Sequence, residues 1–155
     1  MTDTDRASDR LRTAGRLLLG AFLTLAGVGH LTFQRDEFQA QVPGWFPVDA
    51  DLVVLGSGVV EIALGASLIG WRSRRVQVGW ITAAFFVVIF PGNIAQYAEG
   101  TDAFGLDSDG ARLARLYFQP VLVAWALWST GAWKVWRSKR RDPGGQPGGP
   151  GPGRS

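Results

Sequence analysis

The fold is decided by the stretch LVVLGSGVVEIALGASLIGW at residues 52–71, which carries a single charge, Glu61, near its middle. A helix rises about 1.5 Å per residue, so about 20 apolar residues cross a hydrocarbon core that is about 30 Å thick. The stretch has this length, and it lacks the polar stripe of a soluble amphipathic helix. It also lacks the alternation of apolar and polar residues that is typical of a strand. It therefore predicts a transmembrane helix.

Three further apolar blocks of similar length accompany this stretch. Strands are a poor alternative for them, because open sheet edges leave backbone groups unsatisfied in lipid. The sequence predicts an all-α integral membrane bundle of four transmembrane helices, at about residues 14–33, 52–71, 76–98 and 114–136.

The regions outside these blocks are expected to be tails. Residues 1–12 are expected to form a flexible N-terminal tail, and residues 13–136 to form the membrane domain. The segment 137–155 is basic at first and then rich in Gly and Pro, a composition that cannot bury enough apolar surface to fold.

The charges predict the orientation of the bundle. Thirteen of the 16 Lys and Arg residues lie before or at the start of the first block, between the second and third, or from the end of the fourth block onward. The other three lie in the remaining two loops or at the start of the fourth block. By the positive-inside rule, both termini are in the cytoplasm. The net charge of +3 and the basic pI of about 9.9 then reflect the basic residues on the cytoplasmic side of the membrane. A nucleic-acid partner is therefore not expected.

The residue inventory excludes several kinds of active site. The chain has no Cys and one His, which excludes a disulfide scaffold, a thiol redox centre, an iron–sulfur cluster and a multi-histidine metal or haem site. The single His also has no Ser and Asp partners at its depth for a catalytic triad. No intrinsic cofactor is expected, and the inventory favours a protein that is not an enzyme.

Polar residues inside the predicted membrane region are the candidate site. Such residues are costly in lipid and are functional candidates by default. All but Glu61 lie near the outer ends of their helices, and Glu61 lies deeper, as the floor of an outward-facing pocket. The predicted ligand-binding set is His30, Glu61, Asn93, Gln96, Arg115 and Gln119. Each also has a structural interpretation, because polar side chains hydrogen-bond neighbouring helices and Arg side chains extend to headgroups.

Helical spacing supports this pocket. Gly58, Glu61 and Gly65 share one helix face with Ser57, and small residues there let a neighbouring backbone come close to the carboxylate. Pro91 lacks a backbone N–H, so a kink is expected there, with the carbonyl of Val87 opened toward the pocket.

Five segments resemble the DoxX-like family of small four-helix membrane proteins. They are AGVGHLTF (26–33), VPGWFP (42–47), SGVVEIALG (57–65), FPGNIAQY (90–97) and RLYFQPVLVAWALW (115–128). The resemblance covers roughly residues 14–136 and implies a multi-pass protein of the bacterial plasma (inner) membrane. It also implies an accessory role in a membrane redox system, with a quinone as a candidate ligand. The family takes its name from a subunit of a thiosulfate:quinone oxidoreductase, and this chain has no Cys for sulfur chemistry.

Three functions compete at this point. The first is binding of a lipophile, a quinone or a lipid, in the outer-leaflet pocket. The second is a non-catalytic scaffold or assembly subunit whose buried polar residues serve helix packing. The third, a minimal transporter, is the weakest, because the four blocks show no inverted repeat. Expected partners are the lipid bilayer and either a redox-complex subunit or a second copy of the chain.

Overall fold

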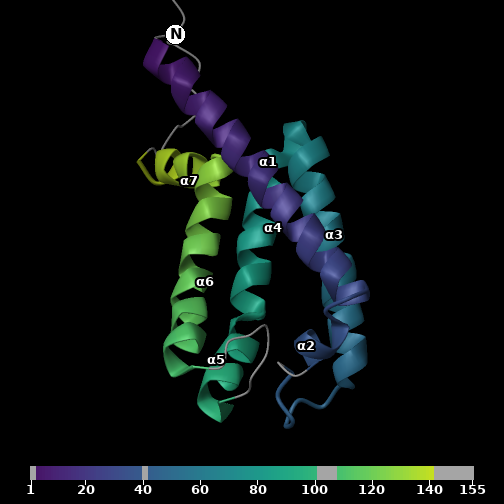
Figure 1. The fold of residues 1–155 in the computed structure, drawn as a ribbon. Coiled ribbons are helices and arrows are strands. Elements are labelled where there is room, and N and C mark those ends of the chain that lie inside the picture. The colour runs from purple at the N-terminus through teal and green to yellow at the C-terminus, as the bar shows by residue number, and fades with distance from the viewer. Residues whose placement is uncertain (1–2, 40–41, 101–107, 142–155) are drawn as a thin grey trace, which may run out of the picture.

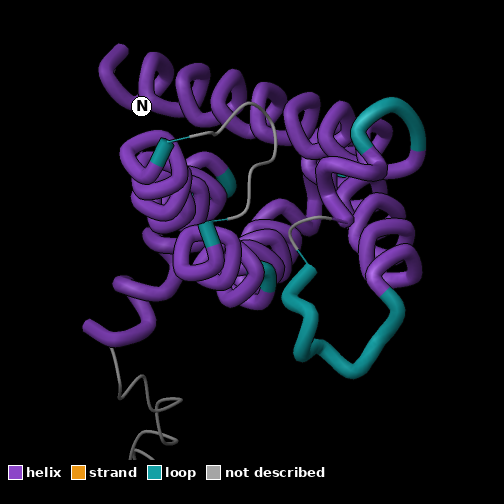
Figure 2. Tube along the Cα trace, turned by 60° about the horizontal axis from the view of Figure 1, so that its bottom comes forward, coloured by secondary structure: helices purple, strands orange, loops and turns teal. Residues whose placement is uncertain are grey.

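The structure, a computed structural model, describes residues 3–39, 42–100 and 108–141. All regular elements in these ranges are helices joined by loops and turns (Figures 1 and 2), so the predicted all-α class is confirmed. The elements are α1 (Asp3–Leu31), α2 (Arg35–Gln39), α3 (Ala50–Gly70), η1 (Arg72–Arg74), α4 (Arg75–Val88), α5 (Phe90–Glu99), α6 (Asp109–Ser129) and α7 (Ala132–Arg141).

Three helical stretches of the described chain are long and apolar enough to cross a membrane. They are α1, α3 and Arg72–Glu99, which joins η1, α4 and α5. The 21 residues of α6 fall outside this set, because Arg112, Arg115 and Gln119 lower the hydropathy of its first half.

The first helix begins earlier than expected. Residues 3–12, predicted as part of a flexible tail, are the first turns of α1. Asp3 and Asp5 lie in the first turn, where negative charge interacts favourably with the positive end of the helix dipole. The prediction for residues 1–2 falls outside the described residues.

The predicted helix at residues 114–136 is wrong at its C-terminal end. The helix α6 ends at Ser129, and Gly131 follows with a φ of 77°. Glycine takes this left-handed conformation without steric cost and commonly ends a helix. The chain then turns into α7, which lies across the end of α6 (Figure 1). Because α7 reaches Arg141, residues 137–141, expected to be part of a tail, are helical. Residues 142–155 lie outside the described part of the chain.

The predicted break near Pro91 is present. The helix α4 ends at Val88, and α5 begins at Phe90 with Pro91 in its first turn. A proline is tolerated there because the first amides of a helix have no intrahelical partner.

The long helices pack as two pairs, α1 with α3 and α4 with α6. Glycines bring α1 and α3 together: a Cβ on Gly27 would lie 2.5 Å from the carbonyl oxygen of Gly58, and one on Gly65 would lie 2.6 Å from that of Gly20. The close approach expected at Gly58 and Gly65 is therefore confirmed. It places the helix face that carries Glu61 directly against α1.

The two pairs contact each other near the α7 end of the molecule. The indole Nε1 of Trp125 on α6 donates to the carbonyl of Gly15 on α1 at 3.0 Å. Leu19 and Leu68 from one pair and Phe86 and Ala126 from the other are buried in one shared core. The opposite end, at α2 and α5, is where the pairs leave space between them.

Candidate functional site

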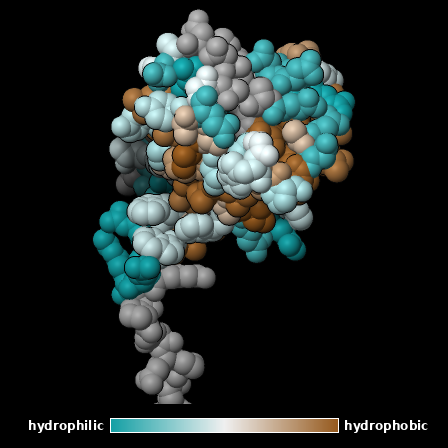
Figure 3. Space-filling view, turned by 90° about the horizontal axis from the view of Figure 1, so that it is seen from below, coloured by the Kyte–Doolittle hydropathy of each residue, from teal (hydrophilic) through white to brown (hydrophobic). Residues whose placement is uncertain are grey.

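A cavity of about 1020 Å³ lies between the two helix pairs. Its wall comes from α1 to α6 and from the segment 42–46, and most of it is apolar. Representative apolar lining residues are Phe22, Val54, Phe86, Phe118 and Leu122. Figure 3 views the molecule from the α2 and α5 end, and apolar residues appear in the middle of that face with hydrophilic ones around them. The volume is large enough for a sizeable organic molecule.

The cavity brings together five of the six predicted site residues. They come from four separate helices and are His30, Glu61, Asn93, Arg115 and Gln119. Four of them are buried, and Arg115 is half-buried. Gln96 is also buried, with a polar partner of its own, but it is not part of the lining. The predicted grouping is therefore found for five residues, and their role as ligand contacts stays a prediction.

His30 and Glu61 form a buried pair across the α1–α3 interface. The Nδ1 atom of His30 lies 3.0 Å from Oε2 of Glu61 and 2.9 Å from the carbonyl oxygen of Ala26, one turn earlier on α1. A Cβ added at Gly58 would lie 2.8 Å from the Cβ of His30, so the glycine allows α3 to approach α1 closely at this point. The pair is thus held by helix packing.

Asn93 and Gln119 form a second polar contact, between α5 and α6. Nδ2 of Asn93 donates to Oε1 of Gln119 at 3.0 Å, and Nε2 of Gln119 donates to the carbonyl of Phe86 at 2.7 Å. The accepting carbonyl of Phe86 lies near the α4–α5 break. The sequence led us to expect the free carbonyl one residue later, at Val87. This contact joins three helix segments at the cavity wall.

Arg115 adds a positive charge to the wall, close enough to Glu61 for the two charges to interact. No cluster of three metal-ligating side chains is present within the described ranges.

Phe38 is a lining residue that the sequence did not indicate. It lies on α2, and its ring stacks on the imidazole of His30 with 3.3 Å between centroids and 17° between planes. The short helix α2 therefore covers the His30–Glu61 pair from the loop side.

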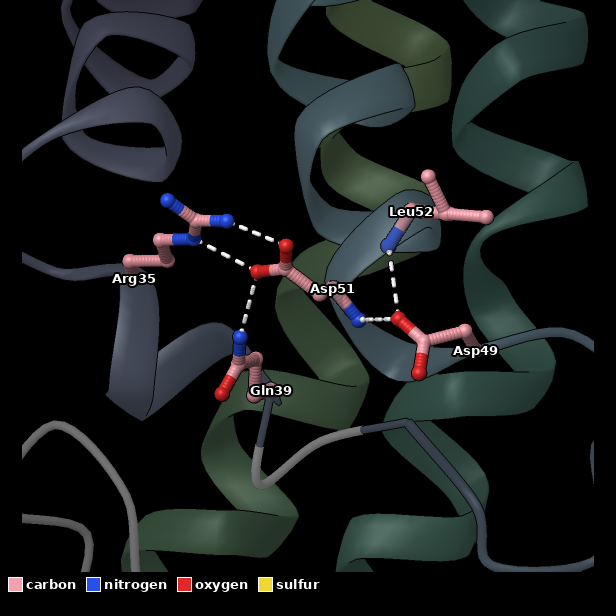
Figure 4. Close-up of polar contacts among 5 residues, drawn as sticks. All are labelled: Arg35, Gln39, Asp49, Asp51 and Leu52. Atoms are coloured by element: carbon pink, nitrogen blue, oxygen red, sulfur yellow. Dashed lines mark hydrogen bonds and ion pairs between the residues drawn. The ribbon is translucent and has the colours of Figure 1, made fainter.

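A polar anchor holds α2 against the start of α3 (Figure 4). Arg35 donates to both carboxylate oxygens of Asp51, and Nε2 of Gln39 donates to Oδ1 of Asp51 at 2.6 Å. Hydrogen bonding to Asp51 raises the pKa of the Arg35 guanidinium. Asp49 caps α3 by accepting from the backbone amides of Asp51 and Leu52. The one sequence signal for this anchor is the spacing of Arg35 and Gln39, which places them on one helix face.

These features define a class: an all-helical protein with membrane-length apolar helices around a largely apolar cavity. We call the five predicted polar residues of its lining the polar wall: His30, Glu61, Asn93, Arg115 and Gln119. Residues 19–130 match a family model described as "Domain of unknown function (DUF8561)", and the chain belongs to this family. The match includes every residue of the cavity's polar wall. Comparison with curated proteins and with solved structures found no match.

Proposed function

We propose that this chain is an integral membrane protein that binds a lipophilic molecule in the cavity between its two helix pairs. The observation that carries the proposal is the composition of the cavity lining, which is mostly apolar and includes a smaller set of polar residues contributed by both helix pairs. An apolar body with one polar head fits such a wall.

Exposed apolar side chains support the membrane location. Leu18 on α1 is 62% exposed and Ile81 on α4 is 58% exposed, and neither lines the cavity. Soluble monomers rarely expose large apolar surfaces, and lipid is the solvent in which such surfaces carry no cost. We propose four membrane crossings, with α6 as the fourth and both termini in the cytoplasm. Arg112 and Arg115 then lie near the outer end of α6, where long basic side chains reach the headgroup region.

The resemblance to the DoxX-like family supports a quinone as one candidate ligand and a lipid as another. On this proposal the protein is an accessory component of a redox system in the bacterial plasma membrane. Partners would be a subunit of that system or a second copy of the chain.

A second candidate function is a scaffold or assembly subunit. The contact of Asn93 with Gln119, and of Gln119 with the Phe86 carbonyl, favours it, because these polar groups already satisfy one another and join three helix segments. On this view the polar wall serves packing, and no ligand is required.

A substitution that fills the cavity distinguishes ligand binding from a scaffold role. Ser57 lines it, and Ser57→Phe places a ring in that space. Ser67 is half-buried on the same helix and is not part of the lining, so Ser67→Phe is the matched control. The measurement is mass spectrometry of the molecules retained by each purified protein. Ligand binding predicts that Ser57→Phe loses a lipophile that the wild type and Ser67→Phe keep. Identical profiles of retained molecules in all three proteins would favour the scaffold.

A further inference from the structure

One carboxylate oxygen in the cavity wall lacks a hydrogen-bond partner. The Glu61 side chain is 7% exposed, and its Oε2 is buried without a hydrogen bond to any described residue. A buried polar atom without a partner costs free energy, so its presence at a cavity wall calls for an explanation.

His30 lies next to this oxygen, yet it does not satisfy it. A carbonyl only accepts hydrogen bonds, so the contact of Nδ1 with the Ala26 carbonyl requires the hydrogen of Nδ1 to point there. Nδ1 carries one hydrogen at most, whether the imidazole is neutral or charged. Oε2 of Glu61 lies 3.0 Å from Nδ1 of His30, but the hydrogen of this nitrogen is donated to the Ala26 carbonyl.

We infer that the cavity selects a lipophile whose polar head is a hydroxyl group, a phenol or an alcohol, which hydrogen-bonds the Glu61 carboxyl group. This inference rests on the proposed function, since it names the ligand class of the same cavity. A hydroxyl donates to an ionised carboxylate, and it also accepts from a neutral carboxylic acid. A ketone or ether oxygen has no hydrogen, so it pairs only with the neutral acid.

The surroundings of Glu61 permit this contact. Glu61 lines the cavity while its Oε2 is buried, so contact of Oε2 with a ligand requires the carboxyl group to turn about its terminal torsion, which is broad in glutamate. Phe38 stacks on the neighbouring imidazole, and Phe118 also lines the cavity. These rings offer apolar contact to the body of the ligand.

The test uses two probes, 4-nonylphenol and its methyl ether, 4-nonylanisole, in which a methyl group replaces the hydroxyl hydrogen. Binding is measured by calorimetry with the full chain in phosphatidylcholine nanodiscs, after subtraction of empty nanodiscs. The wild type is expected to bind the phenol about tenfold more tightly, the ratio expected for one hydrogen bond. Glu61→Leu removes both oxygens and is expected to bind the two probes equally.

A second variant keeps the test decisive if Glu61→Leu fails to fold. Glu61→Gln preserves the shape of the side chain and adds an N–H group that can donate to the ether oxygen. The ratio of the affinities for the phenol and the ether is therefore expected to fall. Equal binding of both probes by the wild type overturns the hydroxyl requirement and leaves the proposed function standing. A preference that survives in both variants overturns the role of Glu61.

Failure of the proposed function itself has a different signature. In that case the wild type binds neither probe, or Ser57→Phe binds both as the wild type does. The cavity is then not the ligand site, and the inference about its ligand falls with it.

Discussion

Gly65 is expected to be a position where even one added methyl group destabilises the protein. A Cβ built there lies 2.6 Å from the carbonyl oxygen of Gly20 and 2.8 Å from the amide nitrogen of Thr24. Both atoms belong to the α1 backbone, which cannot rotate aside as a side chain can. Overpacking of this kind costs about 1–3 kcal/mol.

Gly56 provides the matched control on the same helix. A Cβ at Gly56 meets nothing within 4 Å. Alanine is favoured over glycine in a helix by about 0.5–1 kcal/mol, and both variants gain this amount. The difference between them isolates the clash, so Gly65→Ala is expected to be less stable than Gly56→Ala by about 1–3 kcal/mol.

The assay is reversible unfolding in mixed micelles with increasing sodium dodecyl sulfate, followed by circular dichroism. Equal stability of Gly65→Ala and Gly56→Ala would refute the close approach of α1 and α3. The geometry of the His30–Glu61 pair would then lose its support, because Gly65 lies one turn from Glu61 on the same face.

Three further variants test the polar contacts and the turn. Gln119→Leu leaves the Phe86 carbonyl and the Asn93 amide without their partner and is expected to cost about 1–3 kcal/mol in the same unfolding assay. The loss should be smaller when Asn93→Leu is already present, and strictly additive losses would argue against the contact. Asp51→Asn removes the charge that Arg35 binds, so amide hydrogen exchange in residues 35–39 should quicken, while Asp49→Asn, which keeps the helix cap, should leave it unchanged. Unchanged exchange in Asp51→Asn would show that the anchor does not hold α2. Gly131→Ala forces a Cβ into a φ of 77° and should cost about 1–2 kcal/mol relative to Gly110→Ala, which has open space and no such φ. A Gly131→Ala protein as stable as this control would mean that the turn accepts a Cβ.

The helices and most of the polar wall could be predicted from sequence because they follow from one-dimensional patterns. The length of the apolar stretch 52–71, with Glu61 as its single charge, is enough to predict α3. Consecutive membrane helices alternate in direction, so the C-terminal end of one helix and the N-terminal end of the next lie on the same side of the membrane. His30 and Asn93 lie near C-terminal ends and Gln119 near an N-terminal end, which was enough to group them. Gln96 shares a helix face with Asn93, but its side chain is not part of the lining, a distinction that depends on the exact rotation of α5.

The placement of α2 and Phe38 over His30 could not be predicted, because it depends on contacts between segments that are distant in the sequence. Phe38 lies in a helix of only five residues, and Arg35 and Asp51 appear in the sequence as ordinary loop charges. Their pairing emerges only when α2 folds back onto the start of α3. The end of α6 is a different case, since Gly131 was a readable stop signal that the apolar residues following it obscured.

The two-pair packing has a consequence for how the cavity comes into being. Each pair consists of consecutive long segments of the chain, and η1 joins the second member of one pair to the first member of the other. The polar wall takes His30 and Glu61 from the first pair and Gln119 and Arg115 from the second, so neither pair alone contains the site. A molecule seated in the cavity therefore contacts both halves and stabilises their docking by mass action. We expect two fragments divided within η1 to associate more strongly when such a molecule is present, which makes fragment complementation a measure of binding.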